Sequence, residues 1–392
     1  MKTTARFPFL LTTLLFGADA AAGDPCGTIS EVASIEETLP FGFDVHDSVL
    51  AIYRESIGSI DLYDARSLPA FDLLGSIDVS DLPGYSSVPA GSPLSLDGDR
   101  VYLRLDDETY VWDIADPSAP EPLAQFSGLG GVGVVLNGVQ YEVQVDDDVW
   151  IFSAADVAET GEVTREFGLP NLVGSYALHA EDGFVVVGGA GLDIRQSEPA
   201  SALLGEPIAS VPFDADDIAA HRGVGVVLES GSLTSWRVID FTDPFAPSVQ
   251  GGFEAGAPIF PGGADARRGV AAVPLSFQFG GIGLWSLESG EAVPLATIAT
   301  SFAAQVRLVN GYLISGQAEG NGLPARFAVF DLQGCGPCAA DLALPFRALD
   351  LADIGAFVSG FIGLDARSDL TGDGVWDLGD IQAFVASFNA GC

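Results

Sequence analysis

Short apolar runs separated by tight turns recur along the chain from residue 41 to residue 331. In each repeat, one strand ends at a two-residue turn, a second strand follows, and a short connection leads to a third strand rich in aromatic and aliphatic residues. Several of the turns contain Asp-Gly or Asn-Gly, which tolerate the positive φ angles that a two-residue hairpin requires. The predicted third strands cover residues 60–64, 110–113, 149–153, 191–195, 236–240, 283–286 and 327–331.

The spacing of these repeats predicts the architecture. The last residues of successive third strands lie 40 to 49 positions apart, with a mean of 44.5, and a period of about 45 residues is typical of a four-stranded propeller blade. We therefore predict a mainly β protein with a seven-bladed β-propeller over residues 23–334; an array of β-sandwiches is the alternative. The seventh repeat lacks one strand, which we expect residues 29–35 to supply.

Two connections within the repeats are near copies of each other. Residues 113–120 read D-I-A-D-P-S-A-P and residues 240–247 read D-F-T-D-P-F-A-P. These segments resemble the turn of the LVIVD repeat family, whose units are taken to form β-propellers. The resemblance supports the fold and implies no activity, since propellers host many functions.

The pattern changes in residues 338–392, where a loop followed by a helix occurs twice. Segment 353–361 aligns with segment 380–388 at an offset of 27 residues. Each segment places apolar residues at i, i+3, i+4 and i+7, which form one face of a helix. We therefore expect two helices that bury these faces against each other: Ile354, Phe357, Val358 and Phe361 on the first, and Ile381, Phe384, Val385 and Phe388 on the second.

The loop before the second helix, residues 369–380, has the spacing of an EF-hand calcium loop. Oxygen-bearing side chains stand at loop positions 1, 3, 5, 9 and 12, a glycine at position 6 allows the sharp turn, and a backbone carbonyl at position 7 completes the ligand set. An acidic turn without a metal is the alternative. The predicted Ca²⁺ ligands are Asp369, Thr371, Asp373, the Val375 carbonyl, Asp377 and Asp380.

The duplicated loop and helix, the start at Cys338 and the final Gly391-Cys392 together resemble the GC-type dockerin-like modules of bacterial exported proteins. This resemblance implies a Ca²⁺-dependent module that attaches the chain to a cohesin-like protein or another envelope or extracellular receptor. It also implies a weaker second Ca²⁺ site in the first loop, with Asp341, Asp350 and Asp353 as its carboxylate ligands. Dockerins that bind cohesins carry recognition side chains at loop positions 10 and 11. Those positions are Leu378-Gly379 and Leu351-Ala352 in this chain, in place of the hydroxyl pair of cellulosomal dockerins.

The N-terminus has the parts of an export signal. Two basic residues precede a ten-residue apolar stretch at 7–16, and alanines at 18, 20 and 22 offer cleavage sites. The stretch is shorter than the roughly 20 residues that a membrane span needs. We predict that residues 1–22 are removed, that no transmembrane segment follows, and that the protein is secreted or attached to the cell surface.

Export would place the four cysteines in an oxidising compartment, where disulfides form. Four cysteines allow three pairings. We predict Cys26–Cys335, which would close the propeller ring, and Cys338–Cys392, which would join the two ends of the small module. The Cys335-Gly-Pro-Cys338 sequence also matches a thioredoxin-like redox motif, but the βαβ unit that this chemistry needs is not predicted nearby.

The charge balance excludes several partners and reactions. The sequence has 54 Asp and Glu residues against 16 Lys and Arg, a formal net charge of −38. So few basic residues cannot form a cationic track along phosphates, which excludes nucleic acid as a partner. Lys2 is the single lysine, so the chain has no Schiff-base or P-loop lysine outside the export signal.

Histidines and tryptophans of the repeats are further candidates for function. The histidines lie near turns that follow predicted inner strands and would bind a metal only if they faced one opening; polar packing is the alternative. Tryptophans on the third strands are expected in the blade cores. The histidines are His46, His179 and His221, and the tryptophans are Trp112, Trp150, Trp236 and Trp285.

These observations favour a non-catalytic binding or structural propeller, with a glycan or protein ligand, held in an extracellular complex by its Ca²⁺-dependent module. The alternative is an extracellular polysaccharide-degrading enzyme, a glycoside hydrolase or lyase. Such an enzyme needs carboxylates from different blades that point into the central channel. The candidates are Asp44, Asp216, Asp217 and Asp265.

Overall fold

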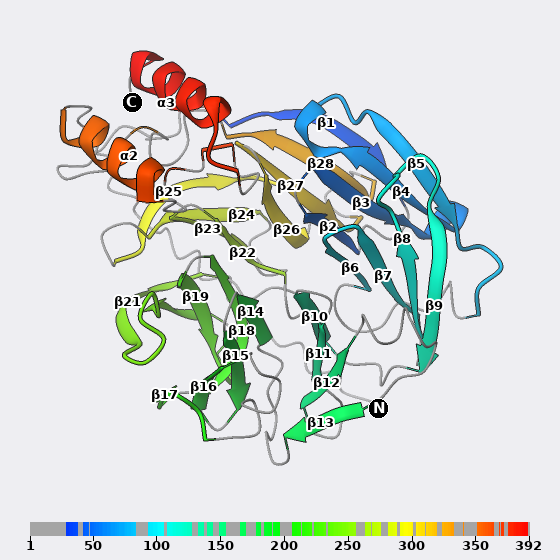
Figure 1. Cartoon of the computed structure of the whole chain (residues 1–392), viewed down its shortest axis with the longest axis horizontal. Helices are drawn as coiled ribbons and strands as arrows, with labels where there is room; N and C mark the ends of the chain where they lie inside the picture. The colour runs from blue at the N-terminus through cyan, green and yellow to red at the C-terminus, as the bar shows by residue number, and fades with distance from the viewer. Residues whose placement is uncertain are drawn as a thin grey trace, which may run out of the picture.

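The computed structural model is a β-propeller followed by a pair of helices (Figure 1). It describes residues 29–37, 42–46, 48–83, 93–105, 108–127, 132–136, 139–143, 149–153, 165–169, 178–181, 184–189, 191–196, 206–212, 214–221, 223–232, 234–255, 263–267, 269–275, 281–287, 291–300, 303–309, 311–319, 324–332, 340, 351–363, 368, 370–371 and 375–390.

Six sheets each contain four consecutive strands in antiparallel order. Their strands are β2 (Phe43–His46), β3 (Val49–Arg54), β4 (Ser59–Asp64) and β5 (Leu73–Asp78); β6 (Leu94–Asp97), β7 (Arg100–Leu105), β8 (Glu108–Asp113) and β9 (Glu121–Ser127); β10 (Val132–Leu136), β11 (Val139–Val143), β12 (Val149–Ser153) and β13 (Arg165–Leu169); β14 (Leu178–Glu181), β15 (Phe184–Gly189), β16 (Gly191–Gln196) and β17 (Ala209–Val211); β18 (Ala215–His221), β19 (Val224–Glu229), β20 (Ser235–Asp240) and β21 (Ser248–Glu254); β22 (Asp265–Arg267), β23 (Val270–Pro274), β24 (Ile282–Ser286) and β25 (Val293–Ile298).

A further four-stranded sheet has the order β1-β28-β27-β26 and combines the N-terminal β1 (Glu31–Glu36) with β26 (Ala303–Val309), β27 (Tyr312–Gln317) and β28 (Arg326–Asp331). The first strands of the sheets, β2, β6, β10, β14, β18, β22 and β26, contact one another in sequence order, and β26 contacts β2. The innermost strands therefore form a closed ring.

The predicted fold class, a seven-bladed propeller inferred from seven repeats, has to be corrected. Six blades are continuous in sequence, from β2 to β25. The remaining sheet is not a continuous blade, because its outer strand β1 comes from the other end of the chain and pairs with β28, for example Ser34 with Ala328. The chain thus has six complete blades and one composite sheet. The contribution of the N-terminal segment, expected at residues 29–35, is confirmed.

The blades pack face to face through apolar side chains. Side chains from β3, β4 and β5 share one buried cluster with those from β6, β7 and β8, and the other clusters likewise join neighbouring blades. Trp112, Trp236 and Trp285 on the third strands are buried, as predicted. The side chain of Trp150 lies outside the described residues.

The hairpin turns confirm the expected backbone geometry. Gly98, Gly223, Gly269 and Gly311 follow innermost strands and have φ angles of 52°, 79°, 72° and 83°. A Cβ at Gly223 would come within 2.6 Å of the Thr242 backbone. Glycine is therefore required at that turn both by its φ angle and by the close approach of the chain.

The C-terminal pair consists of α2 (Leu351–Gly363) and α3 (Leu378–Ala390). The rings of Phe357 and Phe384 stack with their centroids 4.2 Å apart, and Phe361 and Phe388 pack beside them. The predicted apolar faces are only partly correct, because three of their residues point outward: Val358, Ile381 and Val385. In the described part of the chain, neither helix is long and apolar enough to cross a bilayer.

Candidate functional site

Asp380 organises the described part of the predicted calcium loop. It lies in the first turn of α3 and is fully buried. One carboxylate oxygen, Oδ1, accepts hydrogen bonds from the backbone N of Thr371 at 2.9 Å and from Thr371 Oγ1 at 3.1 Å. The other oxygen, Oδ2, accepts from the backbone N of Asp377 at 3.0 Å. These hydrogen bonds therefore hold together Thr371, Asp377 and Asp380, which occupy positions 3, 9 and 12 of the predicted calcium loop.

The electrostatics of Asp380 favour its ionised form. Burial acts to raise the pKa of this carboxyl, but the hydrogen bonds from Thr371 and Asp377 outweigh burial and lower the pKa below its usual value. Asp377 Oδ1 accepts a bond of 2.6 Å from the backbone N of Gly379. A buried, ionised carboxylate beside a hydroxyl is a donor set that suits Ca²⁺.

The rest of the predicted metal set is only partly visible. Asp353, of the weaker site, is fully buried at the start of α2. Within the described ranges, no group of three or more His, Cys, Asp or Glu side chains is placed to hold a metal ion. Several predicted positions lie outside the described residues: the ligands Asp341, Asp350, Asp369 and Asp373, and the cysteines Cys26, Cys335, Cys338 and Cys392.

The candidate carboxylates of the propeller channel hold neighbouring blades together. Asp44 Oδ2 accepts a hydrogen bond of 2.9 Å from the backbone N of Leu96, on the innermost strand of the next blade. Asp265 accepts from Ala266 N at 2.9 Å through Oδ1 and from Leu308 N at 2.6 Å through Oδ2. These two carboxylates therefore cap backbone groups on the ring of innermost strands.

Gln305 makes the corresponding contact from the composite sheet. Its Nε2 donates to the Phe43 carbonyl at 2.9 Å, and its Oε1 accepts from Gly42 N at 3.4 Å. The contact joins β26 to β2 at the point where the ring closes. Gln305 is buried, so its amide replaces water as the partner of these backbone groups.

Two arginines complete this sector of the channel. Arg307 Nε lies 3.3 Å from Asp44 Oδ1, and its Nη1 donates to the Val306 carbonyl at 2.9 Å. Arg267 Nη1 donates to the Leu308 carbonyl at 3.2 Å. Burial raises the pKa of Asp265, although Arg307 and the bond from Leu308 N act in the opposite direction.

The two other candidate carboxylates are also engaged locally. Asp216 Oδ2 accepts from Gly231 N at 3.0 Å, and Asp217 Oδ1 accepts from Ile218 N at 2.9 Å. All four acids predicted for a glycosidase thus bind backbone N–H groups. These contacts favour a structural role for the four carboxylates over acid–base catalysis on a sugar.

The three histidines lie on three innermost strands but not at one level. His46 and His221 are the last residues of β2 and β18, beside the hairpin turns, whereas His179 stands two residues before the end of β14. The His179 ring packs against Phe241 with their centroids 6.4 Å apart. This arrangement matches polar packing better than a shared metal site.

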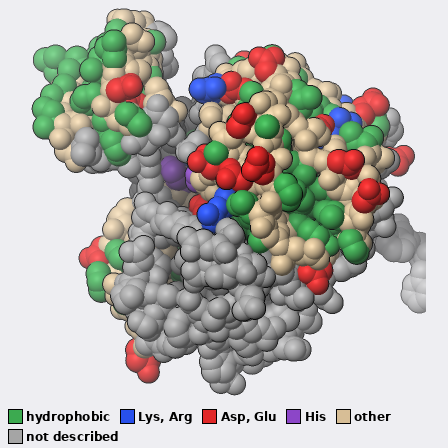
Figure 2. Space-filling model, turned by 45° about the vertical axis from the view of Figure 1, so that its right-hand side comes forward, with side chains coloured by type: hydrophobic (Ala, Val, Ile, Leu, Met, Phe, Trp, Pro, Cys, Tyr) green, Lys and Arg blue, Asp and Glu red, His purple; other side chains and the backbone are tan. Residues whose placement is uncertain are grey.

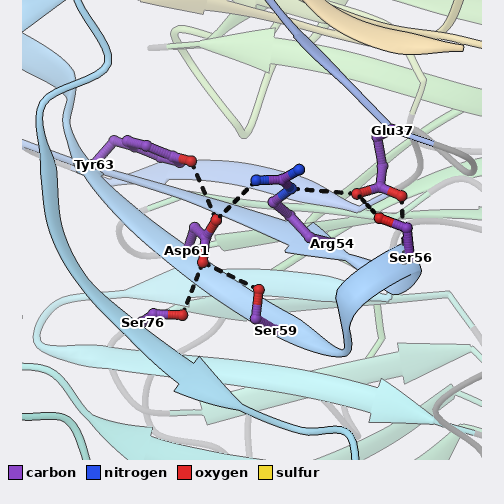
Figure 3. Close-up of polar contacts among 7 residues, drawn as sticks. All are labelled: Glu37, Arg54, Ser56, Ser59, Asp61, Tyr63 and Ser76. Carbon is purple, nitrogen blue, oxygen red and sulfur yellow. Dashed lines mark hydrogen bonds and ion pairs between the residues drawn. The ribbon is translucent and has the colours of Figure 1, made fainter. Parts of the chain in front are cut away.

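A buried polar cluster that the sequence did not predict joins β1 to the first blade (Figure 3). Arg54 Nε lies 3.3 Å from Glu37 Oε2, and its Nη1 lies 3.3 Å from Asp61 Oδ2. Glu37 also accepts from the backbone N and the hydroxyl of Ser56. Asp61 accepts from three hydroxyl groups, those of Ser59, Tyr63 and Ser76.

The titration of this cluster follows from its burial. Burial and the charge of Asp61 raise the pKa of Tyr63 to about 12. Burial and the charge of Glu37 raise the pKa of nearby Glu55. The signal available in the sequence was the alternation Ser59, Asp61, Tyr63, which places three polar groups on one face of β4.

Comparisons with known proteins give the fold alone. No protein-family model and no curated protein matches the sequence. The chain is similar in structure to the β-propeller domain of Cps50 (Swd1) from Myceliophteria thermophila, with a TM-score of 0.57 and 11% identity over 78% of this chain and 99% of that one. It is also similar to the RRP9 WD40 repeats, with a TM-score of 0.54 and 14% identity over 77% of this chain and 97% of that one. BamB from Moraxella catarrhalis is similar with a TM-score of 0.51 and 10% identity over 78% of this chain and 100% of that one.

Proposed function

We propose that the protein is an exported, non-catalytic binding or scaffold protein, in which the propeller presents a surface to a protein partner and the C-terminal helices form a Ca²⁺-dependent attachment module. The observation that carries the non-catalytic role is the use of Asp44 and Asp265 in joining blades. A carboxylate that must cap backbone N–H groups is poorly placed to exchange protons with a substrate.

Structural similarity supports a protein as the partner. One chain of the mitotic checkpoint complex is similar in fold, with a TM-score of 0.54 and 10% identity over 84% of this chain and 96% of that one. Propellers offer a rigid ring on which loops can vary without loss of the core. We therefore propose that the propeller binds protein through its loops.

For the module, the proposal rests on Asp380 and its contacts with Thr371 and Asp377. The Ca²⁺ would be held by Asp369, Thr371, Asp373, the Val375 carbonyl, Asp377 and Asp380, and bound Ca²⁺ would neutralise these carboxylates and fix the loop. The strand pairing supports the proposed bridge Cys26–Cys335. The carbonyl oxygen of Ser30 accepts a hydrogen bond from Asp331 N. Cys26 lies four residues before Ser30 and Cys335 four residues after Asp331, so the two cysteines continue the same antiparallel register. Cys338–Cys392 stays a proposal on the sequence alone.

The test is calcium titration of the full chain combined with fractionation of expressing cells. We expect one tight Ca²⁺ site in the wild type and a loss of affinity of about 100-fold or more in Asp380→Asn, because carboxylate count governs the affinity of such loops. Asp116→Asn is the matched control, since Asp116 is an exposed turn residue in the propeller that accepts hydrogen bonds from Ser118.

The same variants test attachment. Wild type and Asp116→Asn should remain bound to the envelope or to an extracellular complex and should be released from it by EDTA. Asp380→Asn should be found free of the envelope and of any complex without EDTA. Equal calcium affinity in Asp380→Asn and the wild type would overturn the metal site. Loss of calcium binding in Asp380→Asn with the same fractionation for all three proteins would overturn the attachment role.

A further inference from the structure

Two glutamates meet where the N-terminal segment joins the first blade. Glu37 follows the last residue of β1, and Glu55 begins the short 3₁₀ turn η1 (Glu55–Ile57) after β3. The Glu37 side chain is completely buried. Its Oε1 accepts a hydrogen bond of 3.1 Å from the backbone N of Ser56, the residue after Glu55. One carboxylate therefore lies against the turn that carries the other.

The surroundings of the two carboxylates are unequal. Glu37 Oε2 lies 3.3 Å from Arg54 Nε and accepts a bond of 2.8 Å from the Ser56 hydroxyl, as Figure 3 shows. Its charge thus has a cation and donors. Glu55 Oε2 is also buried, but among the described residues no group donates a hydrogen bond to it. An ionised Glu55 is therefore unfavourable, both because this oxygen is desolvated and because Glu37 is a like charge.

Protonation of Glu55 removes both disadvantages. A protonated carboxyl group is neutral, so it no longer repels Glu37, and it offers an O–H donor. When two carboxyl groups share a site, one of them keeps its proton to a higher pH than an isolated acid does. In agreement with this arrangement, burial and the charge of Glu37 raise the pKa of Glu55. Glu55 is partly exposed, so its proton can exchange with solvent.

The other charged and titratable groups around the turn have partners or stay in one state. Arg54 stays protonated, as arginines do in proteins. Burial, together with the charge and hydrogen bond of Asp61, raises the pKa of Tyr63 to about 12, so this phenol stays neutral. Asp61 is bound by Arg54. Asp78 on β5 is exposed and accepts two hydrogen bonds from its own turn. Glu55 is the carboxylate whose ionised form is poorly compensated.

We propose that Glu55 is an acid-sensitive latch on the closure of the propeller. When Glu55 is protonated, Glu37 and Arg54 hold the N-terminal segment firmly to the first blade. When Glu55 is ionised, its charge opposes that of Glu37 and loosens the segment. The backbone bond from Glu37 N to the Ala325 carbonyl, 3.0 Å long, extends the pairing of β1 with β28, so the state of Glu55 affects the strand that closes the ring.

The direction of the pH dependence follows from proton linkage. The folded protein binds the Glu55 proton more tightly than the unfolded chain does, so its stabilising effect is complete below the pKa of an unfolded glutamate, about 4.3. The effect is lost as the pH rises through the higher pKa of the folded state. A pair between a carboxylate and an arginine behaves in the opposite way, because it weakens as the pH falls. The proposal therefore predicts a tighter closure in mild acid.

The test is hydrogen exchange of the full chain with Ca²⁺ present, followed by mass spectrometry and corrected for the intrinsic effect of pH on exchange. Between about pH 7.5 and about pH 5, the wild-type peptide that contains β1 and Glu37 should gain protection at least about threefold. Glu55→Gln imitates the protonated acid and should show the higher protection at both pH values. Glu36→Gln is the matched control and should respond as the wild type does, because Glu36 is exposed on β1.

Two further measurements make the test specific. Peptides from β20 and β21, in a different blade, report the general effect of titrating an acidic protein. Glu37→Gln removes the like charge from the other side and should reduce the response of β1 to pH, and near-ultraviolet circular dichroism checks that each variant is folded. A response that persists in both Glu55→Gln and Glu37→Gln would overturn the proposal. So would an equal gain in β20 and β21, or a loss of protection of wild-type β1 in acid.

Discussion

Asp265 illustrates how one side chain on an innermost strand can join two blades. The innermost strand of a propeller has no further strand beyond it, so N–H groups on its channel side lack a sheet partner. Asp265 supplies acceptors for one such group on its own strand, Ala266 N, and for one on the next, Leu308 N. Asp44 does the same for Leu96 N.

Replacing Asp265 with alanine should therefore lower the free energy of unfolding by about 1–3 kcal/mol, the usual cost of leaving polar groups without a partner. Water that enters the vacated space would keep the value in the lower half of that range. Urea unfolding followed by tryptophan fluorescence measures it. Asp216→Ala is the control and should cost no more than about 0.5 kcal/mol, because its bond to Gly231 N is exposed. Equal effects in the two variants would contradict a special role for Asp265.

At the scale of elements, β1 closes the propeller through both its backbone and a side chain just beyond its end. Its backbone pairs with β28, and Glu37 reaches Arg54 of β3 in the adjacent blade. Arg54 is the cation between two carboxylates, those of Glu37 and Asp61, whose side chains are almost fully buried. The cluster thus ties the N-terminal segment to the blade that follows it.

Arg54→Met should be strongly destabilising, because it leaves two buried carboxylates facing each other without a cation. Breaking a buried ion pair costs about 3–5 kcal/mol; since Arg54 is partly exposed, we expect about 2–3 kcal/mol. Thermal and urea unfolding provide the measurement, and hydrogen exchange should show the loss concentrated in β1. Arg66→Met in the same blade is the control, because the Arg66–Asp64 pair is exposed and should contribute less than about 0.5 kcal/mol. If the two arginine variants lose equal stability, the cluster does not hold the closure.

The strands could be predicted closely from the sequence, whereas the polar contacts could not. The third strands end within one residue of their predicted ends, as β4 does at Asp64, because turn residues and apolar runs mark strand limits locally. The contacts of Asp44 with Leu96, or of Glu37 with Arg54, join residues from different elements and depend on how the blades are arranged around the ring. Val358 and Val385 were assigned to the helix core because periodicity defines an apolar stripe but not which edge of it meets the partner helix.

At the scale of the whole molecule, the acidic charge is the main electrostatic feature. Figure 2 shows many carboxylates on the described propeller surface and few basic groups among them. In most of the described ion pairs, such as Arg237–Glu229 and Arg195–Asp193, one arginine pairs with one carboxylate. With 54 acids against 16 bases in the chain, most carboxylates cannot have a basic partner of their own, so repulsion between carboxylates outweighs attraction to bases.

The melting temperature should therefore rise with salt. Screening by NaCl weakens attraction and repulsion alike, but repulsion between carboxylates outnumbers the ion pairs, so the net effect of screening is stabilising. Between about 10 mM and 0.5 M NaCl we expect an increase of about 2–5 °C, which corresponds to roughly 2–4 kcal/mol for a chain of this size. Differential scanning calorimetry in EDTA excludes calcium as the source of the change. A flat or falling curve would mean that ion pairs such as Arg54–Asp61 contribute more to stability than the excess of negative charge removes.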